Sequence, residues 1–195
     1  MIINLTMNTE ELLQRYAAGE RDFSGIVIWD ANLVKANLRG INLSHADLSG
    51  ACLIAADLSE ANLDQIRLEG SDLTSAILRQ SSLKGAGLEG CQLVNTNCRE
   101  VNMTEAKLWD SCIDGALFYR ANLYRAKLVV SSRYGTDFGD ADMRETMCEC
   151  GKSAAFFERS NLLHASGFVP QKTDTLIETI MPDGTIKDDR PLIRS

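Results

Sequence analysis

Residues 46–63 read ADLSGACLIAADLSEANL, and leucine recurs in this stretch at positions 48, 53, 58 and 63. A spacing of five residues fits neither the 3.6-residue period of an α-helix nor the two-residue alternation of a strand. The spacing continues on both sides of this stretch. When every fifth residue from Phe23 to Cys148 is taken as the centre of a unit, 26 consecutive centres follow without an insertion, and 16 are leucine. A fixed period of this length indicates a repeat architecture.

Each position of the five-residue unit has its own composition. The residue two before the centre is small, with Ala in 13 of the 26 units and Ser or Thr in seven. The residue just before the centre is Asn or Asp in 13 units, and Gly ends eight of them. One large and one small inward residue imply a narrow interior, and the polar residues supply turns. If four units complete one coil, residues 20 apart stack at about the 4.8 Å spacing of paired strands.

This pattern resembles the A(D/N)LXX repeat of the pentapeptide-repeat family. The segments ADLSG (46–50), AADLSEANL (55–63) and ANLYRAKL (121–128) are close to its consensus. The resemblance covers residues 21–150 and implies an all-β solenoid, a right-handed quadrilateral β-helix. The stretches ELLQRYAAGERDFSG (11–25) and MPDGT (181–185) are similar to segments of cyanobacterial members.

A short helix is expected before the coils, over about residues 9–18. Asn8 is its predicted N-cap, and Glu11 has the spacing of a capping box. Gly19 suits the C-terminal stop. The residues expected on one apolar face are Leu12, Leu13, Tyr16 and Ala17. We expect this helix to cover the first coil, so residues 1–20 form a helical cap.

After Cys148 the five-residue frame slips. Residues 154–164 either resume the coils, with centres at Phe157 and Leu162, or form an amphipathic helix; resumed coils are the preferred interpretation. The stretch TLIETIMPDGTI (175–186) predicts two strands joined by a turn at 182–184. We therefore expect irregular final coils, a hairpin and a tail over 151–195, which form the C-terminal cap.

Arg133 is the one charged residue among the 26 centres. Two interpretations stay open, a distorted coil or a guanidinium that reaches a carboxylate or carbonyl near the end of the stack. We expect the distortion.

Composition excludes several classes of function. The net charge of −7 disfavours binding to nucleic acid phosphates, and no apolar run is long enough to span a membrane. The six cysteines fall in different roles of the repeat, which suggests apolar fillers in a reducing, cytoplasmic protein, and the amino-terminal residues do not resemble a signal peptide. The two histidines are far apart and no Cys/His cluster has zinc spacing. We therefore expect no enzyme, no cofactor and no metal site.

Stacking also predicts stripes of side chains along the outside. One stripe holds Arg39, Ser59, Arg79, Arg99 and Tyr119, beside Glu60, Gln80, Glu100 and Arg120. It is either a solvated, ion-paired face or a docking strip for an acidic partner. An Asn-rich stripe (22, 42, 62, 82, 102, 122, 142) is expected to hydrogen-bond along the stack. A third stripe, Val34, Ile54, Thr74 and Val94, is outwardly apolar; it is either a partner surface or a result of the β-propensity of these residues.

Aromatic side chains gather outside the late coils, and Trp, Tyr and Arg are common interface anchors. The candidate partner-binding surface therefore comprises Arg39, Arg79, Arg99, Arg120, Trp109, Tyr119 and Tyr124.

The sequence thus predicts a rigid interaction, scaffold or regulatory protein with an unidentified protein partner, present as a monomer or an end-to-end dimer. The family resemblance also implies an alternative, because some members mimic DNA and modulate DNA gyrase. That role needs a long acidic surface. Residues 21–150 hold 18 Asp or Glu and 13 Lys or Arg, and the acids form no unbroken stripe.

Overall fold

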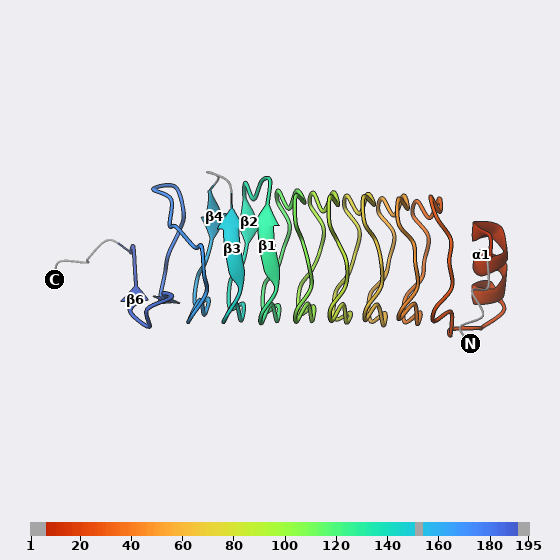
Figure 1. The fold of residues 1–195 in the computed structure, drawn as a ribbon, viewed down its shortest axis with the longest axis horizontal. Coiled ribbons are helices and arrows are strands. Elements are labelled where there is room, and N and C mark those ends of the chain that lie inside the picture. Colours follow the sequence, from red (N-terminus) through yellow and green to blue (C-terminus); the bar gives the residue numbers. More distant parts are fainter. Residues whose placement is uncertain (1–6, 151–153, 191–195) are drawn as a thin grey trace.

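A computed structural model of the protein describes residues 7–150 and 154–190 (Figure 1). Parts of the predicted amino-terminal cap (1–6) and carboxy-terminal tail (191–195) lie outside the described residues. The elements are helix α1 (Thr9–Ala17) and strands β1 (Lys127–Val130), β2 (Thr136–Asp137), β3 (Met147–Cys150), β4 (Ala155–Phe156), β5 (Thr179–Ile180) and β6 (Ile186–Lys187). Figure 1 shows an elongated stack of coils between α1 at one end and β6 at the other.

The coils stack in the 20-residue register that the sequence predicts. Parallel bridges join Asp22 to Asn42, Asn42 to Asn62, and Asn102 to Asn122, and similar bridges follow at five-residue intervals around the coils. Four units therefore complete one coil. Strand β1 pairs in parallel with β3 in the same register. The right-handed sense of the coil stays a prediction from the family resemblance.

Every backbone amide of a typical unit has a hydrogen-bond partner, as the unit around Leu43 shows. The amide of Asn42 donates to a carbonyl of the preceding coil (2.7 Å), and the amides of Leu43 and His45 donate to carbonyls of the following coil (2.8 and 2.9 Å). The amide of Ala46 closes the turn on the carbonyl of Leu43 (3.1 Å). The fifth amide, that of Ser44, donates to Oδ1 of Asn42 (3.1 Å). The side chain before the centre thus satisfies the donor that the ladder leaves over.

This local bond changes the interpretation of the Asn-rich stripe. Bonding along the stack occurs at Asn42, whose Nδ2 donates to Oδ1 of Asp22 at 2.8 Å. The side chains of Asn62, Asn102 and Asn122 instead accept from the amide two residues later. The stripe therefore supports individual turns more than contacts between coils.

The last residue of most units has a positive φ, for example 73° at Gly50 and 70° at Gly70. This residue is the second central residue of the turn, the position at which a type II turn requires positive φ. Glycine adopts this conformation without steric cost, which explains why it recurs there. Ala55 adopts it with φ 55°.

The central side chains fill the interior of the coils. Leu48, Leu68 and Leu88 follow one another at 20-residue intervals, and all three are fully buried. The rings of Phe118 and Phe138 stack at 5.4 Å with an interplanar angle of 9°, and those of Phe138 and Phe157 at 5.1 Å and 12°. Columns of like side chains thus form part of the core.

Polar residues at the small inward position are buried with their hydrogen bonds satisfied. The hydroxyls of Ser71, Thr96 and Ser111 donate to carbonyl oxygens of the preceding coil at 3.1, 2.9 and 2.6 Å. Since a hydroxyl buried without a partner would be costly, these bonds explain why Ser and Thr can replace Ala there.

Helix α1 begins and ends as predicted. The side chain of Asn8 accepts a hydrogen bond from the amide of Glu11 at 2.8 Å. The carboxylate of Glu11 pairs with Arg15 (Oε1 to Nη1, 3.5 Å). Gly19, with φ 102°, follows the end of the helix.

The helix packs on the first coils through part of its predicted face. Leu12 is fully buried in the core, and Leu13 and Tyr16 pack against it while partly exposed. The hydroxyl of Tyr16 donates to the carbonyl of Arg39 at 2.8 Å. The prediction for Ala17 is wrong, because Ala17 is exposed at the end of the helix.

The register shortens from 20 to 19 residues in the late coils. Thr136 pairs with Ala155 in the β2–β4 pair, and Asp142 bridges to Asn161. Phe157 and Leu162 are fully buried. The resumed coils are therefore confirmed, and residues 154–164 contain no helix.

A hairpin follows the last coils. Strands β5 and β6 pair antiparallel, the amide of Met181 donates to the carbonyl of Thr185 (2.7 Å), and the amide of Gly184 donates to the carbonyl of Met181 (2.9 Å). The predicted turn at 182–184 is confirmed.

Both interpretations of Arg133 hold in part. The turn before Arg133 differs from the regular turns, because strand β1 continues to Val130. The amide of Ser131 donates to the carbonyl of Ser111 in the preceding coil (2.9 Å) and does not close a turn. The guanidinium of Arg133 reaches a carboxylate, that of Asp174, with both N–O distances at 3.0 Å. Distortion alone, the expected outcome, is therefore an incomplete account.

Candidate functional site

The predicted basic stripe is largely ion-paired. Nη2 of Arg39 lies 2.5 Å from Oε1 of Glu60, and Nη2 of Arg79 lies 3.6 Å from Oε1 of Glu100. In each pair the glutamate belongs to the following coil. Because all four side chains are exposed, these pairs contribute little to stability. Their charges nevertheless neutralise one another, which favours the solvated face over a docking strip for an acidic partner.

The seven predicted partner-binding residues do not share one surface. Arg39, Arg79, Arg99 and Tyr119 occupy the same stripe, and Arg120 lies next to Tyr119 on the same corner of the coil. Tyr124 is one unit further along the chain, at the next corner. Trp109 is two units before Tyr119, which places it at the diagonally opposite corner of a four-sided coil. The structure therefore brings together five of the seven.

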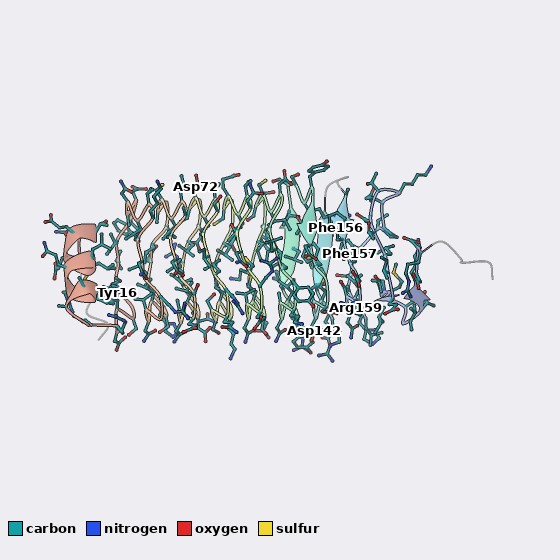
Figure 2. All side chains as sticks on the ribbon, turned by 180° about the vertical axis from the view of Figure 1, so that it is seen from behind. Tyr16, Asp72, Asp142, Phe156, Phe157 and Arg159 are labelled. Atoms are coloured by element: carbon teal, nitrogen blue, oxygen red, sulfur yellow. The ribbon has the colours of Figure 1, made fainter. Side chains whose placement is uncertain are left out.

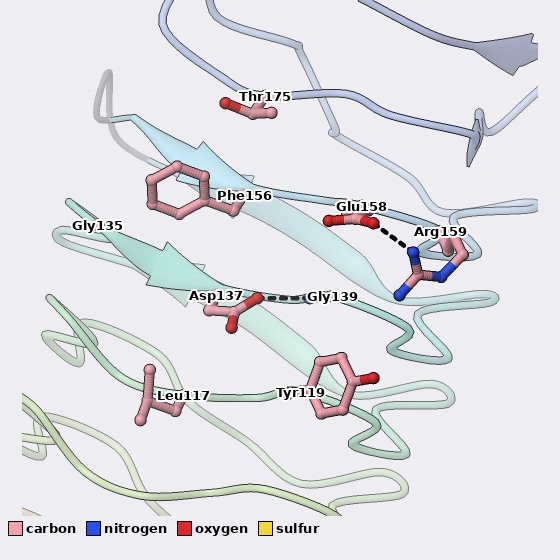
Figure 3. A pocket seen from close by; sticks show the side chains of 9 residues that line it. All are labelled: Leu117, Tyr119, Gly135, Asp137, Gly139, Phe156, Glu158, Arg159 and Thr175. Carbon is pink, nitrogen blue, oxygen red and sulfur yellow. Dashed lines mark hydrogen bonds and ion pairs between the residues drawn. The ribbon is translucent and has the colours of Figure 1, made fainter. Parts of the chain in front are cut away.

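A depression of about 430 Å³ opens on the late coils, on the side that carries Tyr119 (Figure 3). We call it the late-coil depression. Its lining comprises Leu117, Tyr119, Gly135, Asp137, Gly139, Phe156, Glu158, Arg159 and Thr175.

Two aromatic side chains line the late-coil depression. Phe156 points outward with 47% of its surface exposed, whereas its neighbour Phe157 is fully buried (both labelled in Figure 2). In Figure 3 the ring of Tyr119 lies on the coil of Leu117, with Asp137 between it and Phe156. Between them Gly139 has no side chain, and a Cβ added there would lie 3.1 Å from Cδ2 of Tyr119. The lack of a side chain at Gly139 lets the ring of Tyr119 lie against the backbone there.

A network of ion pairs forms the rim. The guanidinium of Arg159 binds Asp140 through Nε–Oδ1 (2.6 Å) and Nη2–Oδ2 (3.1 Å), and its Nη1 pairs with Glu158. Nε of Arg120 lies 3.7 Å from Oδ2 of Asp140. The hydrogen bond from Arg159 holds the pKa of Asp140 below its ordinary value. Both rim arginines therefore already have carboxylate partners.

A second depression, of about 360 Å³, lies at the next corner and includes Tyr124, Arg144 and His164. The hydroxyl of Tyr124 donates to Oε1 of Glu145 (3.0 Å), and Nε of Arg125 donates to Oε2 (2.8 Å). The bond from Arg125, with that from Tyr124, lowers the pKa of Glu145. Burial raises the pKa of Tyr124. The polar groups here mostly satisfy one another.

Sequence reasoning missed Phe156, Arg159 and Trp29. Phe156 and Arg159 follow the slip of the frame, where the sequence left coils and helix as alternatives. Their outward positions follow only from the resumed coils, with a centre at Phe157. Trp29 shares a stripe with Trp109 and is 67% exposed. Its position 80 residues before Trp109 could have revealed that stripe.

Within residues 7–150 and 154–190, no group of three or more His, Cys, Asp or Glu is arranged to hold a metal ion. Those residues also include no helix with the length and apolar character needed to cross a bilayer.

A family profile identifies the protein family to which this chain belongs. The profile described as pentapeptide repeats matches residues 22–59, 51–90 and 81–118, with eight copies of the repeat. The chain belongs to the pentapeptide-repeat family. A comparison with curated proteins found no match.

Solved pentapeptide-repeat structures are similar to this chain. HetL from the cyanobacterium Nostoc sp. strain PCC 7120, described as involved in heterocyst differentiation regulation, is 25% identical with a TM-score of 0.51, and the match covers 93% of this chain and 100% of HetL. Rfr23 from the cyanobacterium Cyanothece 51142 is 20% identical over 84% of this chain and 96% of its own, with a TM-score of 0.36. Full-length QnrB1, a plasmid-mediated fluoroquinolone resistance protein, is 12% identical over 82% and 84%, with a TM-score of 0.44.

Proposed function

We propose that this pentapeptide-repeat protein is a non-enzymatic scaffold or regulatory module that binds a protein partner through its late coils. In this proposal residues 21–150 form a rigid body between an amino-terminal cap (1–20) and a carboxy-terminal segment (151–195). A rigid surface loses little conformational freedom on binding, which is a physical advantage of a solenoid for this role.

The observation that carries the proposal is the late-coil depression with the exposed ring of Phe156. Phe156 is a large aromatic side chain with 47% of its surface in water, and it lies beside a concave surface and a tyrosine. Exposed aromatic residues in such surroundings are typical interface anchors. The tyrosines Tyr16 and Tyr124, by contrast, already have hydrogen-bond partners, the carbonyl of Arg39 and the carboxylate of Glu145.

The similarity to HetL supports the regulatory form of the proposal. The match extends over 93% of this chain and the whole of HetL, a protein described as involved in heterocyst differentiation regulation. A reducing, cytoplasmic setting fits the free thiols of Cys91 and Cys98, which are buried as core residues.

A capture experiment tests the site. The immobilised full-length protein and three variants are exposed to a lysate of the source organism, and bound proteins are identified by mass spectrometry. Phe156→Asp should lose the specific partner. Val34→Asp is the matched control, because Val34 is similarly exposed (42%) on another side of the coils. Arg79→Glu/Arg99→Glu tests the basic stripe and should keep the partner. Equal capture by Phe156→Asp and wild type would remove the late coils as the binding site.

A DNA-gyrase supercoiling assay tests the alternative role as a DNA mimic. We expect no effect of the purified protein on supercoiling, since Arg39 and Arg79 interrupt the acidic surface. Inhibition or quinolone protection at low micromolar concentration would favour the gyrase alternative. Size-exclusion chromatography with light scattering distinguishes a monomer from an end-to-end dimer.

A further inference from the structure

We propose that the late-coil depression receives a basic side chain, arginine or lysine, from an exposed segment of the partner protein. The aliphatic stem would lie on Leu117 and Phe156, and the charged group would pair with the carboxylate of Asp137. This inference rests on the proposed function, because it specifies the chemistry of the partner at the same site.

The apolar part of the depression suits a long, flexible stem. Leu117 and Asp137 lie on one stripe in adjacent coils, and Phe156 follows Asp137 in the β2–β4 register. Figure 3 shows these three side chains along one wall, with Tyr119 beside them. Lysine and arginine bury their methylene groups on such surfaces while their charge stays near water. The ring of Phe156 also attracts cations. The ring of Tyr119 already has Arg120 over it, 5.0 Å from the ring centroid.

The charges of the depression and its rim are not balanced. Three carboxylates, those of Asp137, Asp140 and Glu158, face two guanidiniums, those of Arg120 and Arg159. Both guanidiniums pair with Asp140, and Arg159 also pairs with Glu158. One negative charge is therefore left over.

That charge belongs to Asp137. Its Oδ1 accepts the amide hydrogen of Gly139 at 2.8 Å, a bond within its own unit. Within residues 7–150 and 154–190, Asp137 takes part in no ion pair. A basic group from a partner complements this carboxylate, whereas an acidic group would be repelled and a purely apolar group would bury the carboxylate without compensation.

Gly139 keeps the carboxylate accessible. A Cβ at this position would lie 3.0 Å from Oδ1 of Asp137 and 3.1 Å from Cδ2 of Tyr119. Even a Cβ would therefore crowd both the carboxylate and the ring. The earlier positions on the stripe of Gly139 carry Arg39, Ser59, Arg79, Arg99 and Tyr119, and none of them is a glycine.

An NMR titration tests the chemistry of the occupant. The ¹⁵N-labelled full chain is titrated with three peptides: acetyl-Leu-Arg-amide, its neutral isostere acetyl-Leu-citrulline-amide, and acetyl-Leu-Glu-amide. The amides of Gly135 and Gly139 report on the depression. We expect the arginine peptide to shift these amides and to bind about threefold more tightly than the citrulline peptide, as for an exposed ion pair. The glutamate peptide should bind most weakly.

Two variants provide the matched comparison. Asp137→Asn keeps an acceptor for the amide of Gly139 and should abolish the preference for arginine over citrulline. Asp57→Asn is the control, because Asp57 lies on the same stripe four coils away and makes the same bond, to the amide of Ser59 (2.9 Å). It should leave the preference unchanged.

Each result separates this inference from the proposed function. Equal binding of the arginine and citrulline peptides, or a preference that survives Asp137→Asn, overturns the basic-side-chain inference. If capture of the partner still depends on Phe156 in that case, the proposed function stands. If the protein prefers the arginine peptide but Phe156→Asp captures the partner as well as wild type does, the proposed binding site is wrong.

Discussion

Arg133 and Asp174 form a bidentate ion pair inside the stack of coils, although 41 residues separate them in the sequence. Nη1 and Nη2 of Arg133 each lie 3.0 Å from one oxygen of Asp174. The same carboxylate accepts the amides of Ala155 (3.0 Å) and Gln171 (2.8 Å). One buried carboxylate therefore joins three segments of the chain, two of them beyond the slip in the register.

Asp174→Ala should strongly destabilise the late coils. The substitution leaves a buried guanidinium without its partner, and the loss of one member of a buried pair costs about 3–5 kcal/mol. We expect a lower urea midpoint for the carboxy-terminal part, measured by hydrogen exchange at the amides of Phe157 and Leu176, with less change at Leu48.

The double variant Arg133→Leu/Asp174→Ala tests the cause of that loss. It places Leu at the centre of one unit and Ala two residues before the centre of another, the residue types that are commonest at these positions. The double variant should recover part of the stability lost in Asp174→Ala, because an apolar pair avoids the cost of desolvating two charges. A double variant less stable than the single one would show that the bonds to Ala155 and Gln171 dominate.

Phe138→Ala should destabilise the protein by about 3–5 kcal/mol, since it leaves a cavity in the middle of a stacked column of rings. Tyr134→Ala, four residues earlier, is the control. Tyr134 is 68% exposed, so its truncation should change stability by less than about 0.5 kcal/mol. Urea denaturation followed by circular dichroism measures both. Similar losses in the two variants would contradict the inward and outward assignment.

The regular coils could be predicted from sequence because each position of the unit has one physical task. Leu48 and its equivalents fill the lumen, Asn42 and its equivalents accept a turn amide, and Gly50 and its equivalents take positive φ. These tasks repeat with no insertion from Phe23 to Cys148, so the register needed no long-range information.

The late-coil site could be predicted only in part. Tyr119 and Arg120 were identified because they precede the slip. Phe156 and Asp174 follow it, and the loss of one residue between Cys148 and Ala155 shifts every later position in the unit. Whether a side chain points inward or outward depends on that register. The depression also depends on the lack of a side chain at Gly139. No pattern of residue types in the sequence predicts a depression at this glycine.

The cysteines should differ in reactivity according to their place in the unit. Burial raises the pKa of Cys91 to about 12, and burial also raises the pKa of Cys98. Cys52 and Cys112, just before their centres, are partly exposed. Because the thiolate is the reactive form, Cys52 and Cys112 should react with a maleimide well before Cys91 and Cys98 at pH 7.5. Peptide mapping by mass spectrometry identifies the labelled sites. Labelling of Cys98 as fast as Cys52 would argue against the inward assignment of the centres.

Acid should weaken the late coils through Asp140. The hydrogen bond from Arg159 lowers the pKa of Asp140 in the folded protein, so the unfolded chain binds the proton more readily. The stabilising contribution is present above the ordinary aspartate pKa, near pH 4, and is lost as the pH falls through the lower folded value. We expect the urea midpoint to fall between pH 5 and pH 3, and to fall less in Asp140→Asn, which cannot titrate at this position. Because Asp140 also binds Arg120, 0.5 M NaCl should reduce the difference between wild type and variant. An identical pH dependence in wild type and Asp140→Asn would show that the rim network contributes nothing to acid sensitivity.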